Sequence, residues 1–233
     1  MSDDIDEAID WQGHEISCAG CAHEQLSAAG GCRLRHACVH DRYARRIDRF
    51  FNWNPALAND YVKHPHFEVR AIAAKHASPF YLPPLLDDPE ETVRWNAARR
   101  LPKRLVLRLR HDPHREVRIR IATVLDPEDL MPMMMDDDYY VRRVVARRIP
   151  SDWLLGMISD PDARVRLEIA ERLAPDLLTA MRKDSDWRVR HEVASRIALS
   201  ELHELAKDED PLVREMARGR LDNRSGAAME KPA

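Results

Sequence analysis

The sequence predicts an all-α solenoid, a row of short helical repeats stacked side by side. Seven Val-Arg dipeptides begin at residues 69, 93, 117, 141, 165, 189 and 213, each 24 positions after the previous one. Apolar residues in each copy follow a helical stripe, and a proline comes after that stripe in most copies. Because a unit this short cannot bury its apolar face alone, we expect about seven stacked repeats over residues 64–221.

Residues 1–40 form a separate segment, because they hold every cysteine of the chain and none of the repeats. Cys18, Cys21, Cys32 and Cys38 are spaced Cys-x2-Cys-x10-Cys-x5-Cys. Four thiols at this spacing fit two disulfides, a zinc site or an iron–sulfur cluster. The acidic N-terminus does not read as an export signal, so we expect a cytoplasmic protein without disulfides. Zinc sites usually have two Cys-x2-Cys pairs, whereas this chain has one.

The unequal loops between the cysteines favour a 4Fe–4S cluster with all four as thiolate ligands, and zinc remains the alternative. Backbone N–H groups of small residues can hydrogen-bond the sulfurs of such a cluster. Small residues near the ligands are Ala19, Gly20, Gly30 and Gly31. Four histidines, His14, His23, His36 and His40, are also close in sequence. With four cysteines present, we expect these histidines to surround the site rather than to be ligands.

Residues 41–63 are expected to form an N-terminal capping helix and a connector. From Asp41 to Trp53, aromatic and apolar side chains recur at helical spacing among arginines. A single basic, aromatic helix is a marginal membrane anchor. No stretch approaches the roughly 18 consecutive apolar residues of a membrane span. We therefore expect no membrane partner.

Each repeat is expected to open with an α-helix. The order Asp88, Pro89, Glu90, Glu91 is typical of a helix start, with the aspartate as the cap and proline at the first helical position. If Asp88 is position 0, positions 5, 9, 10 and 13 lie on one apolar stripe. Alanine recurs at position 10, where a small side chain allows close stacking. Proline at position 14 or 15 ends the helix after about twelve residues.

The second half of each repeat is short, with apolar side chains at positions 18 and 21. This spacing of three predicts a 3₁₀-helix as readily as an α-helix. The last copy has Arg218 at position 10, where internal copies have alanine, and it stops at Leu221. A polar outer face is typical of a terminal capping repeat. We expect residues 222–233 to form a flexible tail.

This pattern resembles the leucine-rich repeat variant family over roughly residues 64–221, whereas HEAT-like and armadillo-like arrays have units of about 40 residues. The resemblance implies layers of α- and 3₁₀-helices in a right-handed superhelix. Members of that family are similar in carrying an N-terminal cysteine-rich module with a 4Fe–4S cluster. The resemblance therefore implies that Cys18, Cys21, Cys32 and Cys38 are the ligands of such a cluster.

Arginine occupies position 6 of every repeat, as Arg70, Arg94, Arg118, Arg142, Arg166, Arg190 and Arg214. Position 2, four residues earlier, is acidic in five copies. That order favours intrahelical ion pairs worth about 0.2–0.5 kcal/mol each. We therefore expect a solvated ladder of ion pairs rather than an anion-binding groove.

In residues 99–120, basic residues are not balanced by acidic ones: the stretch has nine Lys and Arg and two acidic residues. Its basic residues include Arg99, Arg100, Lys103, Arg104, Arg108 and Arg110. Such a patch could follow a phosphate backbone. It has no interleaved aromatic residues, so an acidic protein partner fits it at least as well.

The chain lacks the short motifs of common enzyme classes: a Walker loop, a Gly-x-Ser-x-Gly elbow, a dinucleotide fingerprint and a zincin helix. We therefore expect a non-enzymatic iron–sulfur repeat protein that acts as a protein-interaction scaffold. Its cluster would have a structural, electron-transfer or redox-sensing role. The alternative function is nucleic-acid binding through residues 99–120.

Overall fold

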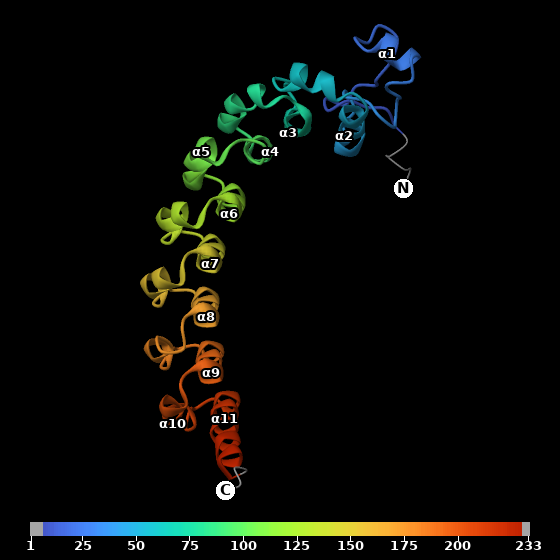
Figure 1. The fold of residues 1–233 in the computed structure, drawn as a ribbon. Coiled ribbons are helices and arrows are strands. Elements are labelled where there is room, and N and C mark those ends of the chain that lie inside the picture. Colours follow the sequence, from blue (N-terminus) through green and yellow to red (C-terminus); the bar gives the residue numbers. More distant parts are fainter. Residues whose placement is uncertain (1–6, 230–233) are drawn as a thin grey trace. The chain divides into compact units, whose positions relative to one another are not determined.

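The computed structural model describes residues 7–229, and the side chains of residues 7–223. These residues form α-helices and 3₁₀-helices, with isolated β-bridges but no strand among them. The chain divides into two compact units, Met1–Val124 and Leu125–Ala233. The all-helical repeat fold predicted from the 24-residue period is confirmed (Figure 1).

The first unit holds the cysteine-rich segment and the first repeats. Its elements are α1 (Glu24–Ala28), α2 (Ala44–Trp53), η2 (Pro55–Tyr61), α3 (Phe67–His76), η3 (Pro79–Tyr81), η4 (Pro83–Asp87), α4 (Glu91–Ala98), α5 (Lys103–Val106), η5 (Leu107–His111) and α6 (Arg115–Val124). Helix α3 packs between α2 and α4, and α4 packs against α6. The cysteine-rich segment therefore adjoins an ordered stack of helices.

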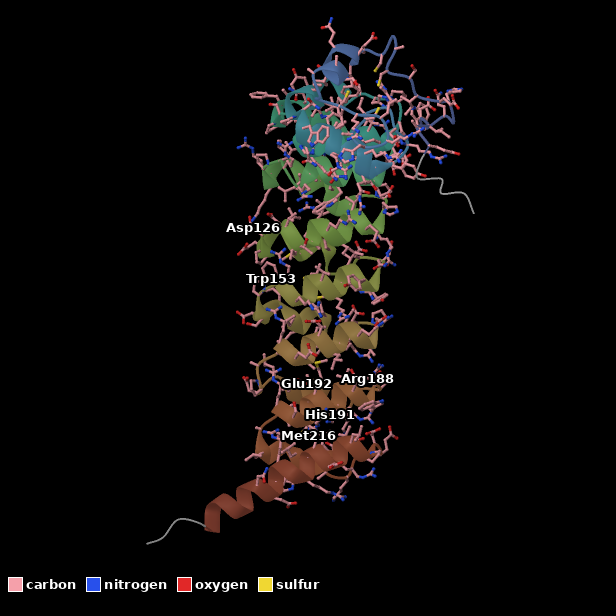
Figure 2. All side chains as sticks on the ribbon, turned by 90° about the vertical axis from the view of Figure 1, so that its right-hand side faces the viewer. Asp126, Trp153, Arg188, His191, Glu192 and Met216 are labelled. Carbon is pink, nitrogen blue, oxygen red and sulfur yellow. The ribbon has the colours of Figure 1, made fainter. Side chains whose placement is uncertain are left out.

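The second unit continues the same alternation of long and short helices. Its elements are η6 (Pro127–Met133), α7 (Tyr139–Arg148), η7 (Ser151–Met157), α8 (Ala163–Arg172), η8 (Leu178–Met181), α9 (Trp187–Arg196), η9 (Leu199–Glu201), α10 (Leu202–Leu205) and α11 (Pro211–Met229). Helices α7, α8, α9 and α11 stack in one layer, and the short helices form the other (Figure 1). Figure 2 faces the α-helix layer, with Arg188, His191 and Glu192 of α9 labelled on it.

The repeat helices begin two residues later than the sequence predicts. Position 2 caps them instead of position 0: the carboxylates of Asp138, Asp162 and Asp186 accept backbone N–H groups at the start of α7, α8 and α9. The position-0 aspartate turns the chain just before that cap, as Asp160 does by accepting the N–H of Asp162 at 2.9 Å. Most repeat helices therefore have ten residues, and the prolines follow their ends as predicted.

The core lies between the two layers. Alanines at position 10 are almost fully buried, including Ala98, Ala146 and Ala194. Side chains at positions 18 and 21, such as Leu154 and Met157, close the core from the short-helix layer. The predicted reason for alanine, close stacking of successive α-helices, is therefore supported by its burial.

The arginine row at position 6 is not the solvated ladder that the sequence suggests. Within each unit, these arginines form two-pronged ion pairs with the position-0 aspartate of the following repeat, 18 residues ahead, with N–O distances of 2.7–3.0 Å. The pairs are Arg70–Asp88, Arg94–Asp112, Arg142–Asp160, Arg166–Asp184 and Arg190–Asp208. Arg94, Arg142 and Arg190 are buried. The position-2 aspartates before α7, α8 and α9 are occupied as helix caps, so they do not act as the predicted partners.

Each of these arginines also binds its own repeat. Its Nη1 donates to the carbonyl oxygen at position 0, as Arg142 does to Asp136 at 2.7 Å and Arg190 does to Asp184 at 2.8 Å. One guanidinium thus joins the loop before its own helix to the loop before the next. The hydrogen bonds that Arg94 and Arg142 donate to the aspartate carboxylates raise the pKa of both arginines. Because both charges are out of water, loss of one partner costs far more than at a surface pair.

A second arginine row, which sequence reasoning missed, occupies position 12. Arg100, Arg172, Arg196 and Arg220 each donate to two carbonyl oxygens at the end of the preceding α-helix. Arg220, for example, lies 2.7 Å from the oxygen of Ala194 and 2.8 Å from that of Ile197. Carbonyls at a helix C-terminus lack intrahelical partners, and a cation there also favours the helix dipole. Successive repeats are therefore joined at both helix ends.

The C-terminal segment differs from the predicted flexible tail. Helix α11 runs from Pro211 to Met229 without a break, so residues 222–229 are helical. Residues 230–233 of that predicted tail lie outside the described residues. Across the part of the chain that the structure describes, no helix combines the length and the apolar character needed to cross a membrane.

Candidate metal centre

The four cysteines come from two segments, one before α1 and one between α1 and α2, and they line one pocket. Cys18 and Cys21 precede α1, Cys32 follows it, and Cys38 precedes α2. The pocket is completed mainly by Ser27, His23, His40 and Phe50. All four are free thiols in the structure. The structure thus brings together the residues that the spacing singles out, although they are up to 20 positions apart in sequence.

Helix α2 holds these loops in place. Asn54, at its C-terminal end, donates to the carbonyl oxygen of Gly31 at 2.7 Å, and Arg49 donates to that of His36 at 2.8 Å. Buried Arg46 pairs with buried Asp41 at 2.9 Å and donates to the carbonyl oxygen of Glu7 at 2.8 Å. Within the segment predicted as a capping helix and connector, residues 44–53 are helical, and this helix packs against α3 and also supports the cysteine loops.

Sulfur atoms in the pocket have polar neighbours. The backbone N–H of His23 donates to Cys21 Sγ at 3.4 Å, and the Ser27 hydroxyl donates to Cys18 Sγ at 3.6 Å. The Cys32 thiol donates to the carbonyl oxygen of His23 at 3.9 Å. Donors aimed at ligand sulfurs stabilise negative charge on them and tune an iron–sulfur centre.

The small residues singled out in the sequence do not supply these donors. The N–H groups of Ala19, Gly20, Gly30 and Gly31 donate instead to oxygens of Ser17, Glu24, Ser27 and Leu26. Gly20 and Gly30 have φ values of +75° and +80°, a conformation that favours glycine. A side chain on Gly31 would collide with Leu26. Glycine is therefore used here for tight turns and close packing.

The surroundings of Cys32 and Cys38 disfavour their thiolate forms in the absence of a bound cation. Burial raises the pKa of the Cys38 thiol to about 11, and the nearby Asp41, Cys32 and Cys21 add to that increase. Burial also raises the pKa of Cys32, with Cys18 and Cys21 contributing. Thiolates that raise one another's pKa are stabilised by a bound cationic centre. The donor set therefore fits an iron–sulfur group.

Of the four nearby histidines, two line the pocket and two lie outside it. His23 and His40 line it, and burial lowers the pKa of both. His23 Nε2 also contacts the hydroxyl of Tyr61, at the end of η2. His14 instead lies 3.4 Å from Asp10, and His36 Nδ1 contacts Arg49. The sequence does not distinguish these two pairs, because all four histidines lie within four positions of a cysteine.

The basic stretch 99–120 is not one surface. Arg100 is held at the end of α3 by the carbonyls described above, and Arg120 stacks on Trp95 with 5.4 Å from its guanidinium carbon to the ring centre. A separate open groove of about 600 Å³ on the short-helix layer is lined by Arg104, Arg108 and Arg110. The predicted patch therefore divides between structural arginines and this groove.

Comparison with known proteins agrees with the fold and with the pocket. Residues 8–60, which include all four cysteines and α2, match the family model described as LRV protein FeS4 cluster. A 27.7 kDa protein from the nifB 3′ region of Rhodobacter capsulatus is 47% identical over 96 residues. That match covers 41% of this chain and 39% of the relative, so this chain spans well under half of it.

A solved structure matches over nearly the whole chain. It is described as a leucine-rich repeat variant with a novel repetitive protein structural motif, and it is 38% identical. The match has a TM-score of 0.86 and covers 94% of each chain. With the stacked repeats and the cysteine pocket, these likenesses show that the chain belongs to the leucine-rich repeat variant family and is an iron–sulfur repeat protein of that family.

Proposed function

We propose that Cys18, Cys21, Cys32 and Cys38 hold a 4Fe–4S cluster as thiolates, and that the loaded module is a one-electron centre attached to a protein-interaction scaffold. The observation that carries this proposal is the meeting of all four free thiols in one pocket. Four cysteines would occupy one corner each of such a cluster. The match of residues 8–60 to an FeS4 family model supports the same choice.

The spread of the thiols favours a cluster over the zinc alternative. Four sulfurs bound to one zinc ion lie within about 4 Å of one another, because each Zn–S bond is about 2.3 Å. Among the described residues, no three Cys, His, Asp or Glu side chains are close enough together to hold one metal ion. A cluster is wider than an ion and fits ligands that line a pocket without converging on one point.

The chain's own residues suit a centre that exchanges electrons with a partner. A bound cluster supplies one-electron transfer, and the His23 N–H and Ser27 hydroxyl would stabilise added negative charge at the ligand sulfurs. Cys38 is buried, whereas the other three cysteines are only partly covered. Two open grooves meet the pocket wall, one along Arg33 and Leu34 and the other along Trp11 and Cys21. A partner at either groove would approach the centre closely.

The repeats supply the partner surface in this proposal. Within each unit, the two arginine rows join successive repeats, and repeat arrays use extended surfaces for binding. Exposed aromatic and arginine side chains, which are enriched at interfaces, include Tyr140, Trp187 and Arg188 on the α-helix side. The protein would act without catalysis by its own side chains.

Metal analysis and electron paramagnetic resonance of protein purified without oxygen test this proposal. We expect about four iron and four sulfide per chain and a signal that appears on reduction by dithionite and disappears on reoxidation. Colourless protein with one zinc ion would overturn the cluster. A full cluster without a reversible signal would overturn the electron-transfer role and leave a structural one.

A further inference from the structure

The groove on the short-helix layer of the first unit is unlike the matching surface of every other repeat. It lies between η4 and the α5–η5 segment. Arginine occupies positions 16, 20 and 22 of this repeat, as Arg104, Arg108 and Arg110. Position 16 is acidic in the next three repeats, with Glu128, Asp152 and Asp176. The concentration of positive charge is therefore specific to this repeat.

The charge in the groove is largely available to a ligand. Arg104 is exposed and makes no side-chain hydrogen bond or ion pair with any residue that the structure describes. Arg108 pairs with Asp87 at 2.9 Å, but both side chains are more than half exposed, at 51% and 69%. Such a surface pair is worth about 1 kcal/mol or less, so an incoming carboxylate can replace Asp87 at little cost.

The floor of the groove is apolar. Leu86 and Leu107 line it, and Leu105 remains 39% exposed at its edge. Phosphate backbones gain little from aliphatic contacts, and single-stranded bases stack on aromatic rings, of which the lining residues supply only the imidazole of His111 and no Phe, Tyr or Trp. A segment with both carboxylates and aliphatic side chains complements both the rim and the floor.

From this combination we propose that the groove binds a partner protein through an acidic peptide segment with leucine-like anchors. Carboxylates of the segment would pair with Arg104, Arg108 and Arg110, and an aliphatic side chain would cover Leu105. This inference rests on the proposed scaffold function and assigns it a site and a class of partner. It does not depend on the nature of the metal centre.

Fluorescence anisotropy of the intact, metal-loaded protein tests the site with a labelled peptide in which glutamate and leucine alternate. We expect Arg104→Ala with Arg108→Ala to weaken binding about tenfold or more, and Leu105→Ser to weaken it severalfold without changing charge. Matched controls in the second unit are Arg164→Ala and Leu155→Ser, at similarly exposed positions. We expect the controls to bind like the unaltered protein.

Three results would overturn the proposal. The first is no binding of the peptide at low salt. The second is equal weakening by the control variants, which would mean charge attraction without a site. The third is that a mixed-sequence oligonucleotide binds more tightly than the peptide and that Leu105→Ser does not change this binding. That result would make the groove a nucleic-acid site. Iron analysis and resonance spectra of the same samples report on the proposed centre separately, so either proposal can fail alone.

Discussion

The cysteine-rich segment and the repeats of this chain keep their shape by different means. Residues 7–43 contain one short α-helix and isolated bridges, and glycines turn the chain between the ligands. The repeats bury a regular core and pair their arginines with fixed partners in the next repeat. A small irregular segment usually needs a metal to fold. We infer that the N-terminal segment depends on its metal centre and that the repeats do not.

The largest expected effect comes from Cys38→Ala. Loss of one thiolate from a buried site should remove nearly all bound iron and expose the amides of residues 18–38 to hydrogen exchange. The amides of α8 should keep their protection, since that helix is held within the second unit. Val39→Ala, beside the ligand and equally buried, is the packing control and should retain iron. Unchanged iron content in the Cys38 variant would contradict the ligand assignment.

The repeats should be destabilised by removal of one partner of a buried ion pair. Asp160→Asn leaves the buried Arg142 without its carboxylate, and we expect the free energy of unfolding to fall by about 3–5 kcal/mol. Asp176→Asn removes the same charge from an exposed position and should change it by less than about 0.5 kcal/mol. Urea unfolding followed by circular dichroism measures both. Equal effects of the two variants would mean that the ladder is only a surface feature.

The contact between the cysteine-rich segment and η2, which precedes the repeats, should have a smaller effect. Tyr61→Phe removes the hydroxyl that meets His23 and leaves that half-buried imidazole without a partner. We expect protection of residues 18–38 against hydrogen exchange to fall by about 1.5 kcal/mol. Tyr81→Phe is the control, because the Tyr81 hydroxyl has no hydrogen bond within the described residues. Equal protection in the two variants would show that Tyr61 does not support the cysteine loops.

The smallest expected effect is the pH dependence of the stability that the Asp186 cap gives to α9. Hydrogen bonds from the Arg188 side chain and then from its backbone lower the pKa of Asp186 to about 2, although burial opposes the shift. Because the folded pKa lies below the unfolded value of about 3.9, this cap stabilises α9 above pH 4 and loses its effect as pH falls towards 2. Asparagine can still cap the helix, but it lacks the charge that pairs with Arg188 and favours the helix N-terminus, so Asp186→Asn should cost about 1 kcal/mol at pH 6 and progressively less between pH 4 and pH 2.

That comparison is read from urea unfolding at several pH values. Asp152, exposed and in the same unit, supplies the control substitution Asp152→Asn. A cost for Asp186→Asn that stays constant down to pH 2 would show that the carboxylate's charge contributes nothing to the cap.

Local patterns in the sequence predicted most of the fold. Apolar spacing, the alanine at position 10 and the prolines correctly indicated an α-helix followed by a short helix in each repeat, since these depend on neighbours in the chain. The predicted length of about twelve residues was two too long, because the cap is at position 2. The partner of each arginine was predicted wrongly, because acids stand both 4 residues before it and 18 residues after it. The sequence did contain a signal for the correct partner. Position 0 is aspartate in six repeats, from Asp88 to Asp208, so an acidic residue recurs there more regularly than at position 2.

The metal centre, too, could be predicted only in part from the sequence. Spacing was enough to select Cys18, Cys21, Cys32 and Cys38, which the structure brings to one pocket. It could not indicate that the His23 N–H, rather than those of the glycines, points to a sulfur, because that depends on backbone angles fixed by the folded loops. The matched position-12 arginines were visible in the sequence, but their carbonyl partners appear only once the helices stack.

The 18-residue reach of the position-6 arginines limits how such a protein can change in size. Insertion or removal of a whole copy leaves every guanidinium facing a new aspartate at the same separation. An insertion of any other length between Arg142 and Asp160 would withdraw the carboxylate from a buried charge. Lengthening or shortening is therefore tolerated only in steps of 24 residues, a restriction that keeps the copies uniform in length while their outer faces are free to diverge.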